Sequence, residues 1–576
     1  MLKDLNIIFT ILGKRDIFNL LVLSILLLIT SFADFLSIGL IIVFFNSILE
    51  NNFGNKIYEF LGEINSYTLN IDFIIFLVYL IFLFFLIKNS LQIAYTYSVT
   101  YFINTLKLKF SKIIFNHYLK KDIGFFFKKD VSEYIRNVNE ETNVFTGFIQ
   151  QKLEYINTSI NIIIISSLVL IYDFKSSSII ILFLLFFYFL YFYLLRKKLL
   201  DLSYLRRSLN KTALKILNTV FLSFKDIRIF NLSDYFVNQF KYNDKVKRQV
   251  SIKKSIYGSI PKHFLEVFIV TCVFVILFYD LPKNYAQSDL IDRAAYLVTF
   301  LIVATRLYPS FASLSKMKNQ LEFGRATVNF FKNNIYLFKK KNNKNTKRKV
   351  IQKVIRDSFE IKKLNFSINE NLIFKNAKMK AFKKDFVYIG GKNGTGKTTL
   401  FDILSGLYQM NKKNTYDVFI DSKKIPNNTV SLISYITQDP IVFNDTIKNN
   451  IILNSSIKNK DLSEILKIAC VQNIIKRLPK GINTILGENG IKLSRGNLQK
   501  IAIARGLVHL KASVYKILIL DEATSAVDYL SEKKIFSGLK NSELYDLVIY
   551  TSHNVSNQKY ANKKFIIKDN QIVKIK

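Results

Sequence analysis

The chain has 576 residues, half of them hydrophobic, yet its formal net charge is +40. This length is enough for two or more domains. High apolar content combined with high charge excludes a single soluble domain and is typical of a membrane protein with basic cytosolic faces. Nucleic-acid binding is disfavoured, because the lysines are spread through loops around apolar segments and no recognition motif is present.

Six apolar segments in the N-terminal part of the chain are candidate membrane spans. A spanning helix needs about 20 mostly apolar residues, and several of these segments reach that length only with their mildly polar flanks. The six segments are Leu20–Phe45, Phe73–Ile87, Ile156–Tyr172, Ile179–Leu195, Phe264–Phe278 and Ala294–Leu307. They predict a helical transmembrane domain over residues 1–330.

Lysine and arginine are concentrated in alternate loops. Leu106–Arg136 and Arg196–Lys254 are rich in them, whereas Glu50–Asn70, Asp173–Ser177 and Asp280–Leu290 hold almost none. The positive-inside rule therefore places both termini and the two lysine-rich loops in the cytosol. We expect these two loops to be helical and to extend far from the bilayer.

Two other segments have distinct compositions. Asn55–Tyr67 carries apolar residues at helical spacing, which predicts either a small helix on the outer membrane surface or an ordinary loop helix packing its own apolar face. The run that begins at Lys339 is basic and poor in apolar residues. It predicts a solvated linker over residues 331–352, near anionic lipid headgroups.

From residue 353 the pattern changes to short apolar strands that alternate with helices. The predicted strands are Phe359–Phe366, Asp385–Ile389, Ser431–Ile436, Ile517–Leu520 and Leu547–Tyr550. Alternation of this kind predicts an α/β domain with a largely parallel sheet over residues 353–576.

The segment Gly391–Thr398 fits G-x-x-x-x-G-K-[ST], the pattern of a phosphate-binding loop. A strand precedes it and a helix, Thr399–Leu407, follows, so the helix N-terminus faces the phosphates. The glycines let backbone N–H groups point inward, Lys397 reaches the β- and γ-phosphates, and Thr398 offers a hydroxyl to Mg²⁺. The predicted ATP contacts in this loop are Gly391, Asn393, Gly394, Thr395, Gly396, Lys397, Thr398 and Thr399.

Polar residues follow three of the predicted strands. Asp521 and Glu522 end the strand Lys516–Leu520, where one carboxylate is placed to hold Mg²⁺ through water and the next to polarise the attacking water. Gln438 is placed to sense the metal and the γ-phosphate, and the His553 imidazole to contact the γ-phosphate.

Further motifs accompany these residues: Leu493-Ser-Arg-Gly-Asn497, Ser525-Ala-Val-Asp528 and Gly487-Glu-Asn-Gly490. The set, in this order over Phe359–Lys576, resembles the ATP-binding cassette of ABC transporters. Six spans followed by one cassette resemble an ABC exporter half-transporter. The resemblance implies a fold of six transmembrane helices followed by an α/β P-loop domain, an ATP hydrolase coupled to transmembrane movement, ATP and Mg²⁺ as cofactors, and a homodimer.

The resemblance also implies a role for each matching residue. Glu522 would be the catalytic base and His553 the switch histidine. Asp521, with Thr398 and Gln438, would hold the metal, and Asp528 would be the D-loop aspartate. Ser494 and Gly496 would touch the γ-phosphate of ATP bound by the other subunit.

Three positions depart from the family pattern. Arg495 and Asn497 stand where the signature usually has glycine and glutamine, so a weakened γ-phosphate contact is expected. Ile368 stands where an aromatic residue usually stacks on adenine. Lys384-Asp385 replaces a usual Gly-Glu turn. Because Glu522 and His553 are present, hydrolysis remains the favoured expectation.

The membrane half resembles bacterial flippases of lipid-linked oligosaccharides, at Asp34, Lys88, Pro261–Glu266 and Arg306–Ser310. In that family an outer surface helix engages the polyprenyl tail and basic groups attract the pyrophosphate. A cation inside a span costs about 2.5–3.5 kcal/mol on insertion scales, so it usually faces a cavity or a partner. Lys88, Lys262 and Arg306 are therefore substrate candidates. The two lysines can alternatively snorkel to the interface, and Asp34 can serve as the counter-charge of Arg306.

These observations predict an ATP-driven flippase or exporter. Its substrate would be an anionic, pyrophosphate-linked oligosaccharide on a lipid, moved across the bacterial inner membrane, with both termini and the cassette in the cytosol. The alternatives are an exporter of another lipid, a drug or a peptide, and a non-transporting membrane sensor gated by ATP.

Overall fold

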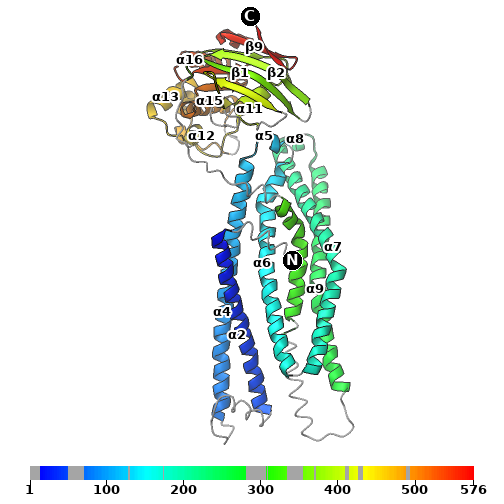
Figure 1. The fold of residues 1–576 in the computed structure, drawn as a ribbon. Coiled ribbons are helices and arrows are strands. Elements are labelled where there is room, and N and C mark those ends of the chain that lie inside the picture. Colours follow the sequence, from blue (N-terminus) through cyan, green and yellow to red (C-terminus); the bar gives the residue numbers. More distant parts are fainter. Residues whose placement is uncertain are drawn as a thin grey trace. The chain divides into compact units, whose positions relative to one another are not determined.

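The computed structural model (Figure 1) describes residues 13–49, 71–127, 130–172, 174–279, 307, 309–333, 355–368, 371–408, 414–425, 433–453, 455–487 and 493–575. The chain forms two compact units. The first comprises residues 1–121 and 128–342, and the second comprises residues 122–127 and 343–576. The predicted linker lies outside the described residues apart from 331–333.

The first unit is built from long helices. They are α2 (Lys14–Leu49), α4 (Ile71–Leu119), α6 (Val131–Tyr172), α7 (Phe174–Leu222) and α9 (Ser233–Tyr279), with the short α8 (Phe224–Ile229) and a further helix over residues 309–333. Within the described residues, two helical stretches are long and apolar enough to cross a membrane, Lys14–Ile41 and Ile75–Leu119. Helices α6, α7 and α9 contain the third to fifth predicted spans. The predicted sixth span lies outside the described residues up to 306, as does the predicted surface helix Asn55–Tyr67.

The helices are much longer than a membrane requires. Helices α4 and α7 each have 49 residues, or about 74 Å at 1.5 Å per residue. A hydrocarbon core is about 30 Å thick, so these helices are longer than one membrane crossing requires. Their outer faces carry exposed apolar residues such as Phe82, Leu83 and Phe186, as expected of helices that face lipid.

The second unit contains two sheets. A six-stranded sheet has the order β10-β9-β3-β8-β7-β6, and a four-stranded sheet has the order β2-β1-β4-β5. The strands are β1 (Ser358–Ile368), β2 (Asn371–Phe382), β3 (Phe386–Gly390), β4 (Thr415–Ile420), β5 (Lys423–Lys424), β6 (Ser434–Ile436), β7 (Ile517–Asp521), β8 (Leu547–Thr551), β9 (Lys563–Lys568) and β10 (Gln571–Ile575).

The larger sheet is largely parallel, as predicted: β6, β7, β8, β3 and β9 pair in parallel, and β10 is antiparallel to β9. The predicted strand Phe359–Phe366 does not belong to it. That segment lies in β1, which pairs antiparallel with β2 and β4 in the smaller sheet. The burial of the strands differs accordingly, because β1 mixes buried with partly and fully exposed residues, whereas β7 and β8 are buried throughout.

Two apolar cores cover the larger sheet. One joins it to the smaller sheet and to α11 (Lys397–Leu404), through residues such as Leu400, Phe401 and Ile519. The other joins it to α12 (Ile447–Ile452), α13 (Asn459–Ile468), α15 (Arg495–Ala512) and α16 (Tyr529–Lys540). The remaining helical turns are α14 (Gln472–Lys476), η1 (Gly481–Asn483) and η3 (Val555–Tyr560).

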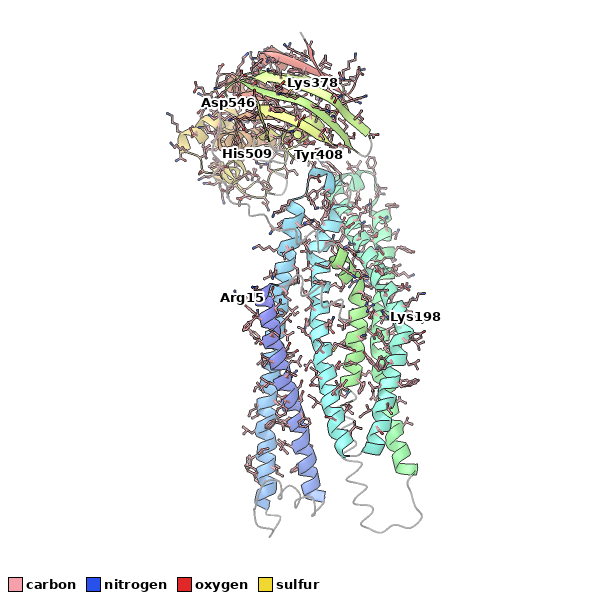
Figure 2. All side chains as sticks on the ribbon, viewed as in Figure 1. Arg15, Lys198, Lys378, Tyr408, His509 and Asp546 are labelled. Atoms are coloured by element: carbon pink, nitrogen blue, oxygen red, sulfur yellow. The ribbon has the colours of Figure 1, made fainter. Side chains whose placement is uncertain are left out.

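A short helix from the N-terminal half of the sequence also belongs to the second unit. Helix α5 (Ile123–Phe126) begins at Asp122, whose side chain accepts a hydrogen bond from the Phe125 N–H. The Ile123 N–H donates to the Leu407 carbonyl at 3.0 Å. Tyr408, which Figure 2 labels, packs edge-on against Phe366. The loop after α11 therefore holds a segment that the chain supplies from the end of α4.

Candidate nucleotide-binding site

The loop between β3 and α11 requires its glycines. Gly391, Gly394 and Gly396 have φ values of 146°, 81° and 101°, in the region that favours glycine. A Cβ on Gly391 would lie 2.7 Å from Thr395 Oγ1, and one on Gly396 would lie 2.7 Å from Ile373 Cγ2. The loop curls back on itself, and Lys397 Nζ donates to the Gly391 carbonyl at 2.9 Å. This curl turns backbone N–H groups toward the N-terminus of α11, the usual arrangement for binding phosphate.

Asp521 and Thr398 meet at the carboxyl end of β7. Asp521 is buried, and its carboxylate accepts a hydrogen bond from the Thr398 side chain. Burial raises the pKa of Asp521, and the Thr398 hydrogen bond opposes this shift. One carboxylate and one hydroxyl beside a phosphate loop fit Mg²⁺, which usually takes one or two carboxylates together with substrate phosphates. Among the described residues, no cluster of three His, Cys, Asp or Glu side chains forms an all-protein metal cage.

Sequence reasoning missed two groups beside Asp521. Tyr435, on β6, donates to Asp521 Oδ2 at 3.3 Å and is also hydrogen-bonded to Asp402 on α11. Burial, reinforced by the nearby Asp521 charge, raises the pKa of Asp402 to about 6, although the Tyr435 hydrogen bond opposes this rise. Neither residue belongs to a recognised motif, so only the fold brings them to the site.

Glu522 lies between two of the predicted site residues. Gln438 Nε2 donates to Glu522 Oε2 at 2.6 Å, and His553 Nε2 lies 2.9 Å from Glu522 Oε1. The Glu522 backbone has a φ of 47°, a conformation that costs a non-glycine residue about 1–3 kcal/mol. The surrounding structure holds it there, since the Glu522 N–H donates to the Thr551 carbonyl at 3.2 Å. The ends of β6, β7 and β8 thus bring Gln438, Glu522 and His553 together.

A buried carboxylate supports the loops on either side of Glu522. Glu532, on α16, accepts hydrogen bonds from Thr524 Oγ1 at 2.6 Å, Asn557 Nδ2 at 2.7 Å and Asn554 Nδ2 at 2.9 Å. Thr524 follows Glu522 in sequence and Asn554 follows His553. Glu532 therefore ties the segment after the proposed base to the segment after the proposed switch histidine, a role that its sequence position alone does not indicate.

The segment Ser494–Asn497 begins helix α15. Ser494 is the N-cap residue, and its hydroxyl accepts a hydrogen bond from the Asn497 N–H at 3.3 Å. A Cβ on Gly496 would lie 2.4 Å from the Ala526 carbonyl oxygen, so close approach of the D-loop requires glycine there. Arg495, which replaces a usual glycine, pairs with Asp439 beside Gln438. The substitution therefore connects the signature to the loop that carries Gln438.

Asp528, the expected D-loop aspartate, is bound by side chains of its own chain. Lys500 Nζ lies 2.8 Å from Asp528 Oδ2 and 2.8 Å from Ser531 Oγ. The hydrogen bond from Lys500 holds the pKa of Asp528 well below its usual range. Asp528 also caps α16 by accepting from the Ser531 N–H.

The other departures from the family pattern are accommodated by the fold. Lys384 has a φ of 65°, in a turn where glycine is usual, and its Nζ donates to the Tyr545 carbonyl at 2.8 Å. Asp385 accepts from Asn562 and lies 2.8 Å from Lys563 Nζ. Ile368 is half-buried and packs against the core that joins the two sheets.

The predicted substrate residues have different surroundings. Lys88 Nζ lies 2.6 Å from Asp34 Oδ1, and Asn161 Nδ2 donates to Asp34 Oδ2 at 3.3 Å. Asp34 therefore forms an ion pair with Lys88. Lys262 is exposed on α9, next to Pro261. Arg306 lies outside the described residues.

The phosphate loop and the carboxylates at the end of β7 define the second unit as a P-loop nucleotide-binding domain. A model of the ABC transporter family matches residues 374–525, and a model of the ABC transporter transmembrane region matches residues 20–279. The chain therefore belongs to the ABC transporters in which a transmembrane region is fused to an ATP-binding domain.

Three known proteins illustrate the likeness. A protein of Rickettsia typhi named among export ATP-binding/permease proteins is 35% identical over 224 residues, and an ATP-dependent lipid A-core flippase of Desulfotalea psychrophila is 33% identical over 220 residues. Each alignment spans 38% of this chain and 38% of the relative. The structure of a bacterial Atm1-family ABC exporter with ATP bound matches with a TM-score of 0.77 over 97% of this chain and 95% of that one. At 16% identity, the last match shows the fold alone.

Proposed function

We propose that the chain hydrolyses ATP and uses the free energy to move a lipid-type substrate across a membrane. The observation that carries this proposal is the position of Glu522, held between Gln438 and His553 at the edge of the sheet that bears the phosphate loop. A carboxylate so oriented is suited to accept a proton from an attacking water. The transmembrane region in the same chain supplies the part that would move the substrate.

The proposal assigns a role to each of the other residues of the nucleotide-binding site. Lys397 and the loop N–H groups bind the β- and γ-phosphates, with Asn393, Thr395 and Thr399 in the same loop. Asp521, Thr398 and Gln438 hold Mg²⁺, which when bound neutralises phosphate charge. His553 contacts the γ-phosphate. The hydrogen bond from Gln438 and the close approach of His553 Nε2 to Glu522 Oε1 fix the direction in which the Glu522 carboxylate points.

A second copy of the chain would complete each ATP site. Ser494 and Gly496 begin α15 and pack toward the D-loop of their own chain. In a homodimer these two residues would meet the γ-phosphate bound by the partner. The proposed localisation is the bacterial inner membrane, with the cassette and both termini in the cytosol.

The proposed substrate is an anionic lipid-linked oligosaccharide. ATP-dependent lipid A-core flippases are among the relatives, which supports a lipid-type substrate. Lys262 and Arg306 would attract the pyrophosphate, whereas Lys88 would contribute less because Asp34 neutralises it. A second candidate function, an ATP-gated sensor without transport, is favoured by Arg495, which stands where the signature usually has glycine and pairs with Asp439.

The test of the proposed chemistry is ATP turnover by the purified full-length protein in lipid nanodiscs. Glu522→Gln should retain ATP binding and lose about 100-fold or more of its turnover, because the attacking water loses its base. Glu543→Gln, on the exposed surface of the same unit, is the matched control and should keep normal turnover. Equal turnover in Glu522→Gln and the parent protein would contradict the assignment.

A further inference from the structure

A cavity of about 210 Å³ lies within the helical unit, between α6, α7, α9 and the helix over residues 309–333. Its lining includes the side chains of Gln151, Arg206, Lys254, Gln320 and Phe323. A water molecule occupies about 30 Å³ in the liquid, so the space suits a group several times that size. The helices that surround it run side by side in Figure 1. The lining combines two cations and two amides with apolar side chains such as Val144 and Phe148, and the cations distinguish it from a packing void.

Two of the lining cations share one aromatic ring. The Arg206 guanidinium carbon lies 4.9 Å from the centroid of the Phe323 ring, and Lys254 Nζ lies 4.5 Å from the same centroid. Cation–π contact stabilises each charge modestly. Because both charges are positive and close together, they also repel each other.

Neither cation has a carboxylate partner. In the described part of the chain, no carboxylate lies within ion-pair distance of Arg206 or Lys254, and Arg206 Nε is buried without a hydrogen-bond partner. The nearest influential carboxylate, Glu141, is already occupied: Arg207 Nε lies 3.2 Å from it, and Thr327 Oγ1 donates to it at 2.6 Å. Burial lowers the pKa of Lys254, and the neighbouring Arg206 charge lowers it further.

We propose that this cavity binds a phosphate or diphosphate group. A guanidinium presents a planar fork that matches two phosphate oxygens, and an ammonium adds a compact point charge. The amides of Gln151 and Gln320 add donors at the same lining. A bound dianion would pair both cations, satisfy Arg206 Nε and remove the repulsion across Phe323. The proposal rests on the geometry of the helical unit alone. It adds a phosphate-binding site that the proposed transport activity does not assign.

Calorimetric titration of the full-length protein in phosphatidylcholine nanodiscs with inorganic pyrophosphate tests the site. All variants carry Lys397→Ala, which weakens phosphate binding at the cassette. The parent should bind one pyrophosphate per chain. Arg206→Gln and Lys254→Gln should each weaken binding about 10–100-fold, the equivalent of losing one charge-assisted hydrogen bond. Lys253→Gln, an exposed neighbour on α9, is the matched control and should bind like the parent.

A cavity-filling variant separates a binding role from a structural one. Gly147 lines the cavity, and a Cβ built on it meets nothing within 4 Å. Gly147→Leu should therefore abolish pyrophosphate binding while both cations remain, and it should not lower the melting temperature, because leucine favours a helix more than glycine. Gly258→Leu, at an equally open position on α9 outside the lining, should leave binding intact.

Lipid composition distinguishes two sources of the phosphate group. If a lipid headgroup fills the site, nanodiscs with phosphatidic acid should weaken pyrophosphate binding relative to phosphatidylcholine; a soluble phosphate compound predicts no such competition. Either result supports the site. Pyrophosphate binding that is absent in the parent, or unchanged in both Lys254→Gln and Gly147→Leu, would overturn it. Arg206 Nη2 also donates to Thr327 Oγ1 at 3.3 Å, whereas among the described residues Lys254 has no hydrogen bond or ion pair with Thr327 or Glu141. Lys254→Gln therefore tests the site even if Arg206→Gln does not fold.

Discussion

Lys88, on α4, forms an ion pair of 2.6 Å with Asp34, on α2, and both side chains are mostly buried. This pair joins two helices whose lengths and apolar sequences suit membrane crossing. Asn161 on α6 donates to the second oxygen of the same carboxylate. The charges therefore serve first to hold three helices together.

Removing one member of this pair should destabilise the helical unit. Lys88→Gln leaves the Asp34 carboxylate unpaired, at a cost of roughly 3 kcal/mol, and the melting temperature in nanodiscs should fall. Asp34→Asn combined with Lys88→Gln should recover most of the loss, because no charge remains unpaired. If Lys88→Gln instead melts like the parent and transports less substrate, Lys88 is a substrate contact and not a structural partner.

Glu532 should be a positioning residue for ATP turnover. Glu532→Ala removes the acceptor of hydrogen bonds from Thr524, Asn554 and Asn557, although Asn557 Nδ2 keeps its bond to Ser552 Oγ at 3.0 Å. Each buried donor left unpaired costs about 1–3 kcal/mol. We expect kcat to fall at least tenfold with little change in KM for ATP, since the phosphate loop is untouched. Steady-state kinetics beside a melting curve measure both effects. A variant with normal kcat and a lowered melting temperature would show a purely structural role.

Asp402 should make the second unit less stable as pH rises. Its folded pKa of about 6 lies above its ordinary value of 3.8, so the folded state binds the proton more tightly than the unfolded state does. The proton is lost as pH rises through about 6, and stability falls across the window between these two values. Asp402→Asn should flatten the melting temperature between pH 5 and pH 7 relative to the parent. An identical slope in both proteins would contradict this pKa shift.

The proposed sharing of each ATP site between two chains predicts a particular result for mixed dimers. Lys397→Ala damages the phosphate loop of one chain, and Ser494→Arg blocks the signature that would serve its partner. A mixed dimer of the two variants should retain one intact site and measurable turnover, whereas each homodimer should be nearly inactive. Turnover by a strictly monomeric preparation, equal per chain to that of the parent dimer, would contradict the shared site.

Part of the nucleotide-binding site could be predicted from the sequence, and part could not. The phosphate loop could be predicted because glycine, lysine and threonine at fixed spacing have one main use, and the spacing survives without tertiary context. Gln438, Glu522 and His553 could be predicted because polar residues after parallel strands collect at one sheet edge. Asp402, Tyr435 and Glu532 could not, since ordinary helix and strand positions carry them and only packing makes them neighbours.

In the helical unit, even less could be predicted from the sequence about which side chains become neighbours. Apolar runs predicted where the helices lie, but not which charges pair between them. Asp34 pairs with Lys88 because the packing of α2 against α4 brings these two residues together, and neither apolar run indicates that pairing. The Arg206 and Lys254 pair has no sequence signal, since each looks like one more cation in a lysine-rich loop.

The most direct test of the central claim is ATP-driven movement of a fluorescent pyrophosphate-linked oligosaccharide lipid in vesicles that carry the full-length protein with its cassette outward. The account predicts movement that requires Mg²⁺ and ATP, is lost in Glu522→Gln and is retained in Glu543→Gln. ATP hydrolysis without any movement of this lipid, or of another phosphorylated glycolipid in the same vesicles, would contradict it.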